Sequence, residues 1–195
     1  MDLPVRSPKL ALSTAEWQLA FEDQFILTKH RIIAEVYEIF GCLADAYRQQ
    51  AVGLAKQYPQ AFAGQPRISK GEQYEQMPWV MLDYPRCFDN EGHFAIRSFF
   101  WWGHHFSIRL HVSGQYASDL SAAVERLGQQ GWQVGQTNDP WDYELPNAHW
   151  QQLHTAPASE LWLIAGKKIP VTDWAQAFQF YVAAFAELMT ELQQA

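Results

Sequence analysis

Residues 93–112 read HFAIRSFFWWGHHFSIRLHV, and this stretch decides the fold. Its second half alternates strictly between apolar and polar residues, as a β-strand with one buried face does. The apolar set is Phe106, Ile108, Leu110 and Val112. The polar set is His105, Ser107, Arg109 and His111. The segment therefore predicts a hairpin of two strands that turns near Gly103.

The length of the turn follows from cross-strand pairing, because residues directly opposite each other share a face of the sheet. A two-residue turn at Gly103 and His104 would pair Phe100 with Ser107 and mix the faces. A three-residue loop over 102–104 pairs Phe100 with Phe106 and keeps one face apolar. Gly103 can supply the left-handed residue that such loops favour. The further pairs expected are Ser98 with Ile108, Ile96 with Leu110, and Phe94 with Val112.

This register places Arg97 directly opposite Arg109. Like charges that face each other across strands are unfavourable, so a negative group is expected nearby. Asp83, in the preceding strand, has the parity to share their face, although the sequence does not order the strands. Trp101 and His111 belong to the same face. Because guanidinium groups match carboxylate and phosphate oxygens, these five residues form a candidate site for a small anionic ligand.

Two other interpretations of this face stay open. In the simplest one the face is solvated, and Arg97, Arg109 and Asp83 form surface ion pairs that contribute less than about 1 kcal/mol each. In the other, further elements or a second subunit cover it. An exposed face rich in aromatic residues is unusual for a monomer, which favours a covered face or an interface.

Helical patterns flank this region on both sides. Ser13 and Glu16 form a capping box, and apolar residues at steps of three or four then predict a helical segment over 14–57. One straight helix of that length would measure about 65 Å, whereas a compact domain of this size is about 40 Å across. We therefore expect a bend or break near Gly41, or a helix that projects against a partner chain. A second pattern predicts a C-terminal helix over 172–192.

Between these helices the sequence predicts strands at 79–84, 94–102, 105–112, 132–134 and 161–165, with a short helix that begins near Ser118. Residues 58–71 are rich in turn-forming residues, and 136–158 form an irregular stretch that contains Trp141, Tyr143 and Trp150. Strands in succession between helices indicate an α+β fold. We expect one domain over 1–195, with an antiparallel sheet of four to six strands in 79–166 packed against long N- and C-terminal helices.

Composition narrows the possible functions. The 195 residues are 48% hydrophobic and 15% aromatic, which excludes a disordered chain or a disulfide scaffold. A net charge of -7 argues against a nucleic-acid partner. There is no apolar run of about 20 residues and no signal-peptide pattern at the N-terminus, so we expect a cytoplasmic protein with no membrane partner. Cys42 and Cys87 are then free thiols.

The sequence contains none of the glycine-rich phosphate loops, nucleophile elbows or zinc-binding helix motifs that identify common enzymes. Its seven histidines do not show the spacing of a metal site; His105 and His111, for example, lie about 20 Å apart along a strand. We therefore expect no catalytic residue, metal or cofactor.

The strings over 77–86 (MPWVMLDYPR), 99–103 (FFWWG) and 111–114 (HVSG) resemble an uncharacterised bacterial protein family. This resemblance implies a bacterial cytoplasmic protein and brings no activity or ligand with it. From the residues themselves, the first hypothesis is a non-enzymatic interaction protein that forms a homodimer, because of the long apolar helical stripe. The alternative is a small-molecule binder or enzyme with a carboxylate or phosphate ligand at Asp83, Arg97, Trp101, Arg109 and His111.

Overall fold

A computed structural model describes residues 11–89, 92–137 and 162–195. The chain divides into two compact units, of which the first ends at Glu35 and the second begins at Val36. The helices are α1 (Thr14–Ala20), α2 (Asp23–Gln50), α3 (Val52–Gln57), α4 (Gly114–Gln129), the 3-10 helix η2 (Val171–Gln176) and α5 (Ala177–Leu192). The strands are β1 (Arg67–Tyr74), β2 (Met77–Phe88), β3 (His93–Trp101), β4 (His105–Val112), β5 (Gln133–Thr137) and β6 (Trp162–Pro170).

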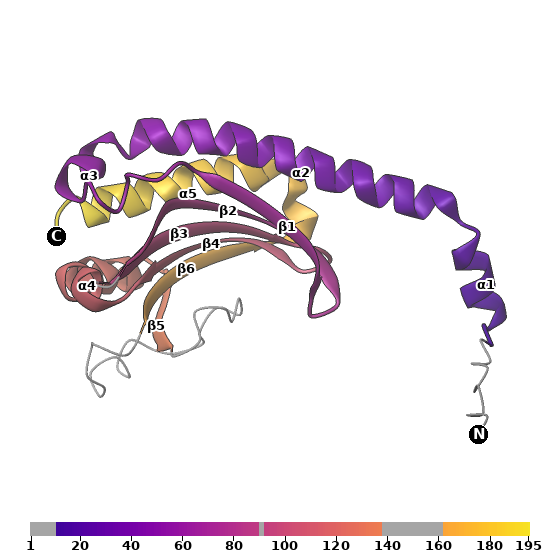
Figure 1. The fold of residues 1–195 in the computed structure, drawn as a ribbon. Helices are drawn as coiled ribbons and strands as arrows, with labels where there is room; N and C mark the ends of the chain where they lie inside the picture. Colours follow the sequence, from indigo (N-terminus) through magenta and orange to yellow (C-terminus); the bar gives the residue numbers. More distant parts are fainter. Residues whose placement is uncertain (1–10, 90–91, 138–161) are drawn as a thin grey trace, which may run out of the picture. The chain divides into compact units, whose positions relative to one another are not determined.

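The strands form one six-stranded sheet in the order β1-β2-β3-β4-β6-β5, and every neighbouring pair is antiparallel. The expected α+β class is therefore confirmed (Figure 1). The register of the β3–β4 hairpin is also confirmed, since Phe100 lies opposite Phe106 and Arg97 lies opposite Arg109. Gly103 has a φ of 76°, which is the left-handed conformation that the short turn requires.

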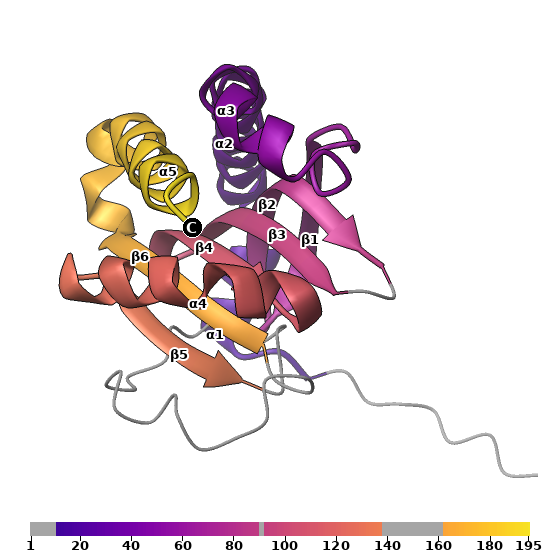
Figure 2. The ribbon, with the colours of Figure 1, turned by 90° about the vertical axis from the view of Figure 1, so that its left-hand side faces the viewer.

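The helices of the second unit cover one face of this sheet. Figures 1 and 2 show α5 and the later part of α2 running side by side over the strands. Tyr47 of α2 stacks on Phe185 of α5, with 3.7 Å between ring centroids. Its hydroxyl lies 2.7 Å from Ser98 Oγ, so a hydrogen bond satisfies the one polar residue that the register places among the apolar side chains of the hairpin.

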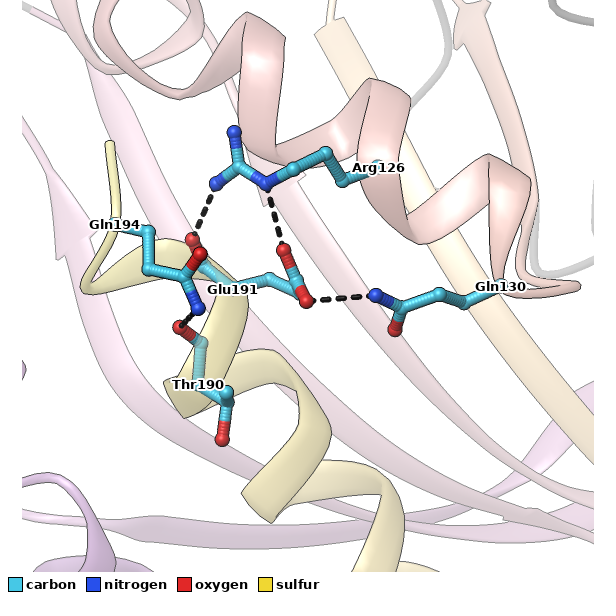
Figure 3. A network of polar contacts seen from close by, with 5 residues as sticks. All are labelled: Arg126, Gln130, Thr190, Glu191 and Gln194. Carbon is cyan, nitrogen blue, oxygen red and sulfur yellow. Dashed lines mark hydrogen bonds and ion pairs between the residues drawn. The ribbon is translucent and has the colours of Figure 1, made fainter.

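A polar network fastens α4 to the end of α5 (Figure 3). Arg126 Nε donates to the Glu191 carboxylate at 2.7 Å, and Arg126 Nη2 donates to the Glu191 backbone carbonyl at 2.8 Å. Gln130 Nε2 donates to the other carboxylate oxygen at 2.7 Å. These hydrogen bonds hold the pKa of Glu191 below its ordinary value, so the carboxylate stays ionised at neutral pH.

The expected break of the N-terminal helical segment at Gly41 is wrong. Gly41 lies inside α2, and the interruptions fall instead after Ala20 and at Ala51. A glycine costs a helix about 1 kcal/mol relative to alanine. Its neighbours Phe40 and Leu43 are fully buried, and that burial contributes more than the glycine removes.

The structure also differs from the sequence expectation at the edge of the sheet. β1 lies in a region where turns were expected over 58–71. Among the described strands it pairs only with β2. It is mostly polar, so it lacks the alternation by which a half-buried strand is recognised. At the C-terminal end, η2 occupies 171–176, and regular α-helix begins only at Ala177.

Two further expectations concern membrane-spanning helices and the two cysteines. No described helix combines the length and the apolar character that crossing a bilayer requires. Cys42 and Cys87 are free thiols. The irregular stretch with Trp141, Tyr143 and Trp150 lies outside the described residues.

Candidate functional site

The face of the sheet that points away from the helices carries the candidate ligand residues. We call Asp83, Arg97, Arg109 and His111 the charged cluster. The side chains come from three adjacent strands, β2, β3 and β4. Each of these residues is at most 3% exposed. The interpretation of this face as a solvated surface is therefore wrong, and the covered interpretation holds.

Asp83 supplies the negative group that the hairpin register requires. β2 lies next to β3, and Asp83 sits directly opposite Arg97. Arg97 Nε donates a hydrogen bond to Asp83 Oδ1 at 2.9 Å, and Arg86 Nε lies 4.0 Å from the other carboxylate oxygen. Burial raises the pKa of Asp83, while the charge of Arg97 acts in the opposite direction. The direct hydrogen bond from a guanidinium indicates that the carboxylate is ionised at neutral pH.

Arg109 lies between Arg97 of β3 and Gly166 of β6. Because Gly166 has no side chain, β6 places none directly opposite Arg109. His111 has a similar neighbour, because the residue opposite it on β3 is Ala95. On its other side, His111 lies opposite the buried Ile164 of β6.

His111 is the most deeply buried member of the charged cluster. Burial lowers its pKa well below the ordinary value, and the charges of Arg97 and Arg109 lower it further. The imidazole is therefore neutral and offers one N–H donor and one nitrogen acceptor. Neither ring nitrogen has a hydrogen-bond partner among the described residues. Buried polar atoms without partners are uncommon in proteins and call for an explanation.

Trp101, the fifth candidate, lies four residues along β3 from Arg97. It belongs to an apolar cluster with Met81 and Phe99 near the hairpin turn. Its indole stacks on the ring of His104 at 3.6 Å between centroids. The structure thus brings Asp83, Arg97, Arg109 and His111 together and places Trp101 at the end of the face.

Sequence reasoning missed Phe88 and Trp162, which border the charged cluster at the opposite end. The Phe88 ring lies under the Arg97 guanidinium at 5.7 Å, and Trp162 meets the His111 ring edge-on at 6.4 Å between centroids. Simple alternation from Asp83 puts Phe88 on the wrong face. The register of β2 against β3 shifts between Asp83 and Arg86, which reverses the parity. Pro85, which has no N–H to donate to a strand partner, was the available signal.

A second candidate surface lies in the first unit. We call Trp17, Leu19, Phe21, Phe25, Ile26 and Leu27 the N-terminal apolar surface. These side chains are 46% to 77% exposed, and α1 contains no buried residue. The apolar pattern from which the helix was predicted thus extends into α1 and the start of α2, where its side chains are exposed. A group of large exposed apolar side chains on one short segment is typical of an interaction site.

Comparison with known proteins finds no matching family model, no matching curated protein and no matching solved structure. In residues 11–89, 92–137 and 162–195, no three His, Cys, Asp or Glu side chains gather as a metal site would need.

Proposed function

We propose that this protein is an interaction protein that self-associates through its N-terminal apolar surface, with a second copy of the same chain as the partner. The observation that carries the proposal is the exposure of six large apolar side chains within residues 17–27. Single exposed apolar residues are ordinary, but a contiguous group on one short segment is a feature of protein interfaces.

The energy available from this surface is sufficient for a reversible dimer. Burying one large apolar side chain contributes about 1.5–3 kcal/mol. The six side chains are already about half covered, so a two-fold contact that buries them in both copies contributes on the order of 10 kcal/mol. Lost translational and rotational freedom offsets at least about 4 kcal/mol. The balance predicts association in the micromolar to millimolar range.

The charges along this segment favour a second copy in the antiparallel orientation. Glu22 and Asp23 precede the apolar centre at Phe25, whereas Lys29 and Arg31 follow it. Two copies related by a two-fold axis near Phe25 bring the acidic end of one against the basic end of the other. A parallel arrangement would set like charges side by side, which opposes association.

The test is the sedimentation of variants altered on this surface. Phe21→Ser and Phe25→Ser are each expected to weaken association at least about tenfold, since each removes apolar area from both halves of the contact. Val52→Ser is the matched control, because Val52 is 55% exposed but lies in α3 of the other unit. Equal association of all three variants and the wild type would show that the N-terminal apolar surface does not mediate self-association.

A charge exchange tests the orientation. Glu22→Lys and Lys29→Glu should each weaken association, and the double variant should restore it, because the two charges face each other in the antiparallel dimer. Circular dichroism of each variant checks that the helices remain. A parallel dimer does not predict that the double variant restores association, because Glu22 and Lys29 do not face each other in it.

A further inference from the structure

We propose that Ser113 and His93 form a catalytic dyad that hydrolyses small carboxylic esters, with Ser113 as the nucleophile and His93 as the general base. The proposal does not depend on self-association, because both residues belong to the second unit. It starts from one short contact, in which Ser113 Oγ lies 2.7 Å from His93 Nδ1. A serine within hydrogen-bond reach of a base is the arrangement by which a nucleophilic site is recognised.

The hydrogen bonds around Ser113 Oγ indicate where the hydroxyl proton points. The backbone N–H of His93 donates to this oxygen at 3.2 Å. With that acceptor position used, we assign the hydroxyl proton to the contact with His93 Nδ1, which makes Nε2 the protonated nitrogen of the neutral imidazole. The same backbone N–H remains beside the oxygen as negative charge develops on it. It therefore favours the loss of the proton.

Ser113 departs from the usual behaviour of a serine at its position. It is the N-cap residue of α4, where a serine normally accepts a hydrogen bond from the first turn of the helix and contributes about 1 kcal/mol. Within the described helix, its side chain makes no such bond, and the hydroxyl contacts His93 instead. Departures of this kind from local stabilising patterns are expected at functional sites.

Aromatic rings on two neighbouring segments hold the His93 imidazole in place. Phe88, directly opposite on β2, lies 5.4 Å away between ring centroids, and Trp162 stacks on the imidazole at 4.5 Å. Burial lowers the pKa of His93, while the charge of Asp89 acts in the opposite direction. The imidazole is therefore neutral at neutral pH and able to accept a proton, and the Asp89 charge stabilises the imidazolium that results.

A small ester can reach the dyad, because Ser113 and His93 are half-buried rather than enclosed. Ser113 lies where β4 turns into α4, and Gly114 makes this turn sharp with a φ of 59°. A sharp turn from strand to helix is also where the serine of many hydrolases meets its substrate. Phe88 is 37% exposed and offers apolar surface to the acyl or aryl part of the ester.

The proposed reaction consumes only the ester and water. Ser113 Oγ attacks the carbonyl carbon, and the hydroxyl proton passes to His93 Nδ1. The ester C–O bond then breaks, and the departing alcohol takes that proton and leaves its acyl group on Ser113. Water attacks the acyl group and gives a proton to Nδ1. The acid is released as this proton returns to Ser113 Oγ.

The first experiment treats the wild-type protein with diethyl p-nitrophenyl phosphate, which transfers its diethylphosphoryl group to an activated serine and releases p-nitrophenol. Mass spectrometry is expected to find a single diethylphosphoryl group on each chain, and peptide mapping should place it on Ser113. No labelling, or labelling of another residue, would overturn the proposal. Because this experiment needs no variant, it stays decisive if a substitution at Ser113 prevents folding.

Variants then separate the nucleophile from the base. With p-nitrophenyl acetate, the wild type should release a burst of p-nitrophenolate before slower turnover. Ser113→Ala should abolish the burst, and His93→Asn should slow it at least about 100-fold, which is the usual contribution of a general base. The matched controls are Ser121→Ala, at an exposed serine of α4, and His30→Asn, at an exposed histidine of α2. Both should behave as the wild type does.

Circular dichroism checks that each variant is folded. A burst that survives Ser113→Ala would show that another group is acylated. An equal burst rate in His93→Asn and the wild type would show that the imidazole takes no proton from Ser113. Either result would refute the dyad.

Discussion

Asp83 accepts a hydrogen bond from Arg97 at 2.9 Å across the β2–β3 pair, and both side chains are almost completely buried. Removing a charge from water costs several kcal/mol, and the partner charge offsets that cost only while both groups are present. The pair therefore fixes the arrangement of the charged cluster, and its two members depend on each other.

Asp83→Asn is expected to lower the free energy of unfolding by about 3–5 kcal/mol, because it leaves the Arg97 charge buried without this partner. Urea denaturation monitored by tryptophan fluorescence measures the change. Asp45→Asn is the control, since Asp45 forms an exposed ion pair with Arg48, and its loss should cost less than about 1 kcal/mol. Similar losses for the two variants would show that burial does not strengthen the Asp83 pair.

Burial of His111 makes stability depend on pH. Its folded pKa lies well below the ordinary histidine value of 6.5, so below pH 6.5 the unfolded chain binds a proton that the folded protein excludes. Stability therefore falls as the pH is lowered through this window, by about 1.4 kcal/mol per pH unit for each such group. His105, whose pKa is lowered to about 4, acts in the same direction.

His111→Asn should thus reduce the slope of stability against pH between pH 5 and 6 by about 1.4 kcal/mol per unit. The measurement is a series of urea denaturation curves in that interval. An unchanged slope in His111→Asn would mean that the imidazole is accessible to protons in the folded state.

The Tyr47–Ser98 hydrogen bond is expected to couple α2 to β3. Tyr47→Phe and Ser98→Ala each leave one buried hydroxyl without this partner, and each should cost about 1–3 kcal/mol. The double variant should cost less than the sum of the single variants, because neither hydroxyl then remains. Additive losses in the double-mutant cycle would show that the two hydroxyl groups do not interact.

Arg126 should contribute to the attachment of α4 to α5 through Glu191 (Figure 3). Arg126→Ala removes a charged hydrogen bond to the carboxylate and a second one to the backbone carbonyl, which predicts a loss of about 1.5–3 kcal/mol. Arg48→Ala, which breaks an exposed pair with Asp45 on α2, is the control and should cost less than about 1 kcal/mol. If the losses are equal, the network adds nothing beyond a surface ion pair.

The register of the central hairpin was predictable because it depends on local alternation. A slip by one residue would have exposed Phe106 and Ile108, so only one pairing satisfied both strands. The juxtaposition of Arg97 and Arg109 followed directly. The contact with Asp83 needed in addition the order of the strands, which alternation does not contain.

Other features could not be predicted from the local sequence pattern, for physical reasons. Parity shows which side chains share a face but not whether anything buries that face, so the burial of Arg97 and Arg109 was left open. Phe88 was assigned no role, because the expected strand ended at Tyr84, and beyond it a register shift inside β2 reverses the alternation. β1 was missed because an edge strand can be polar on both faces.

Sedimentation equilibrium of the wild-type protein measures self-association. A self-associating chain has an average mass that rises from the 22.5 kDa of one chain toward twice that value as the concentration increases from micromolar to millimolar. A mass that stays at 22.5 kDa throughout this range would contradict it.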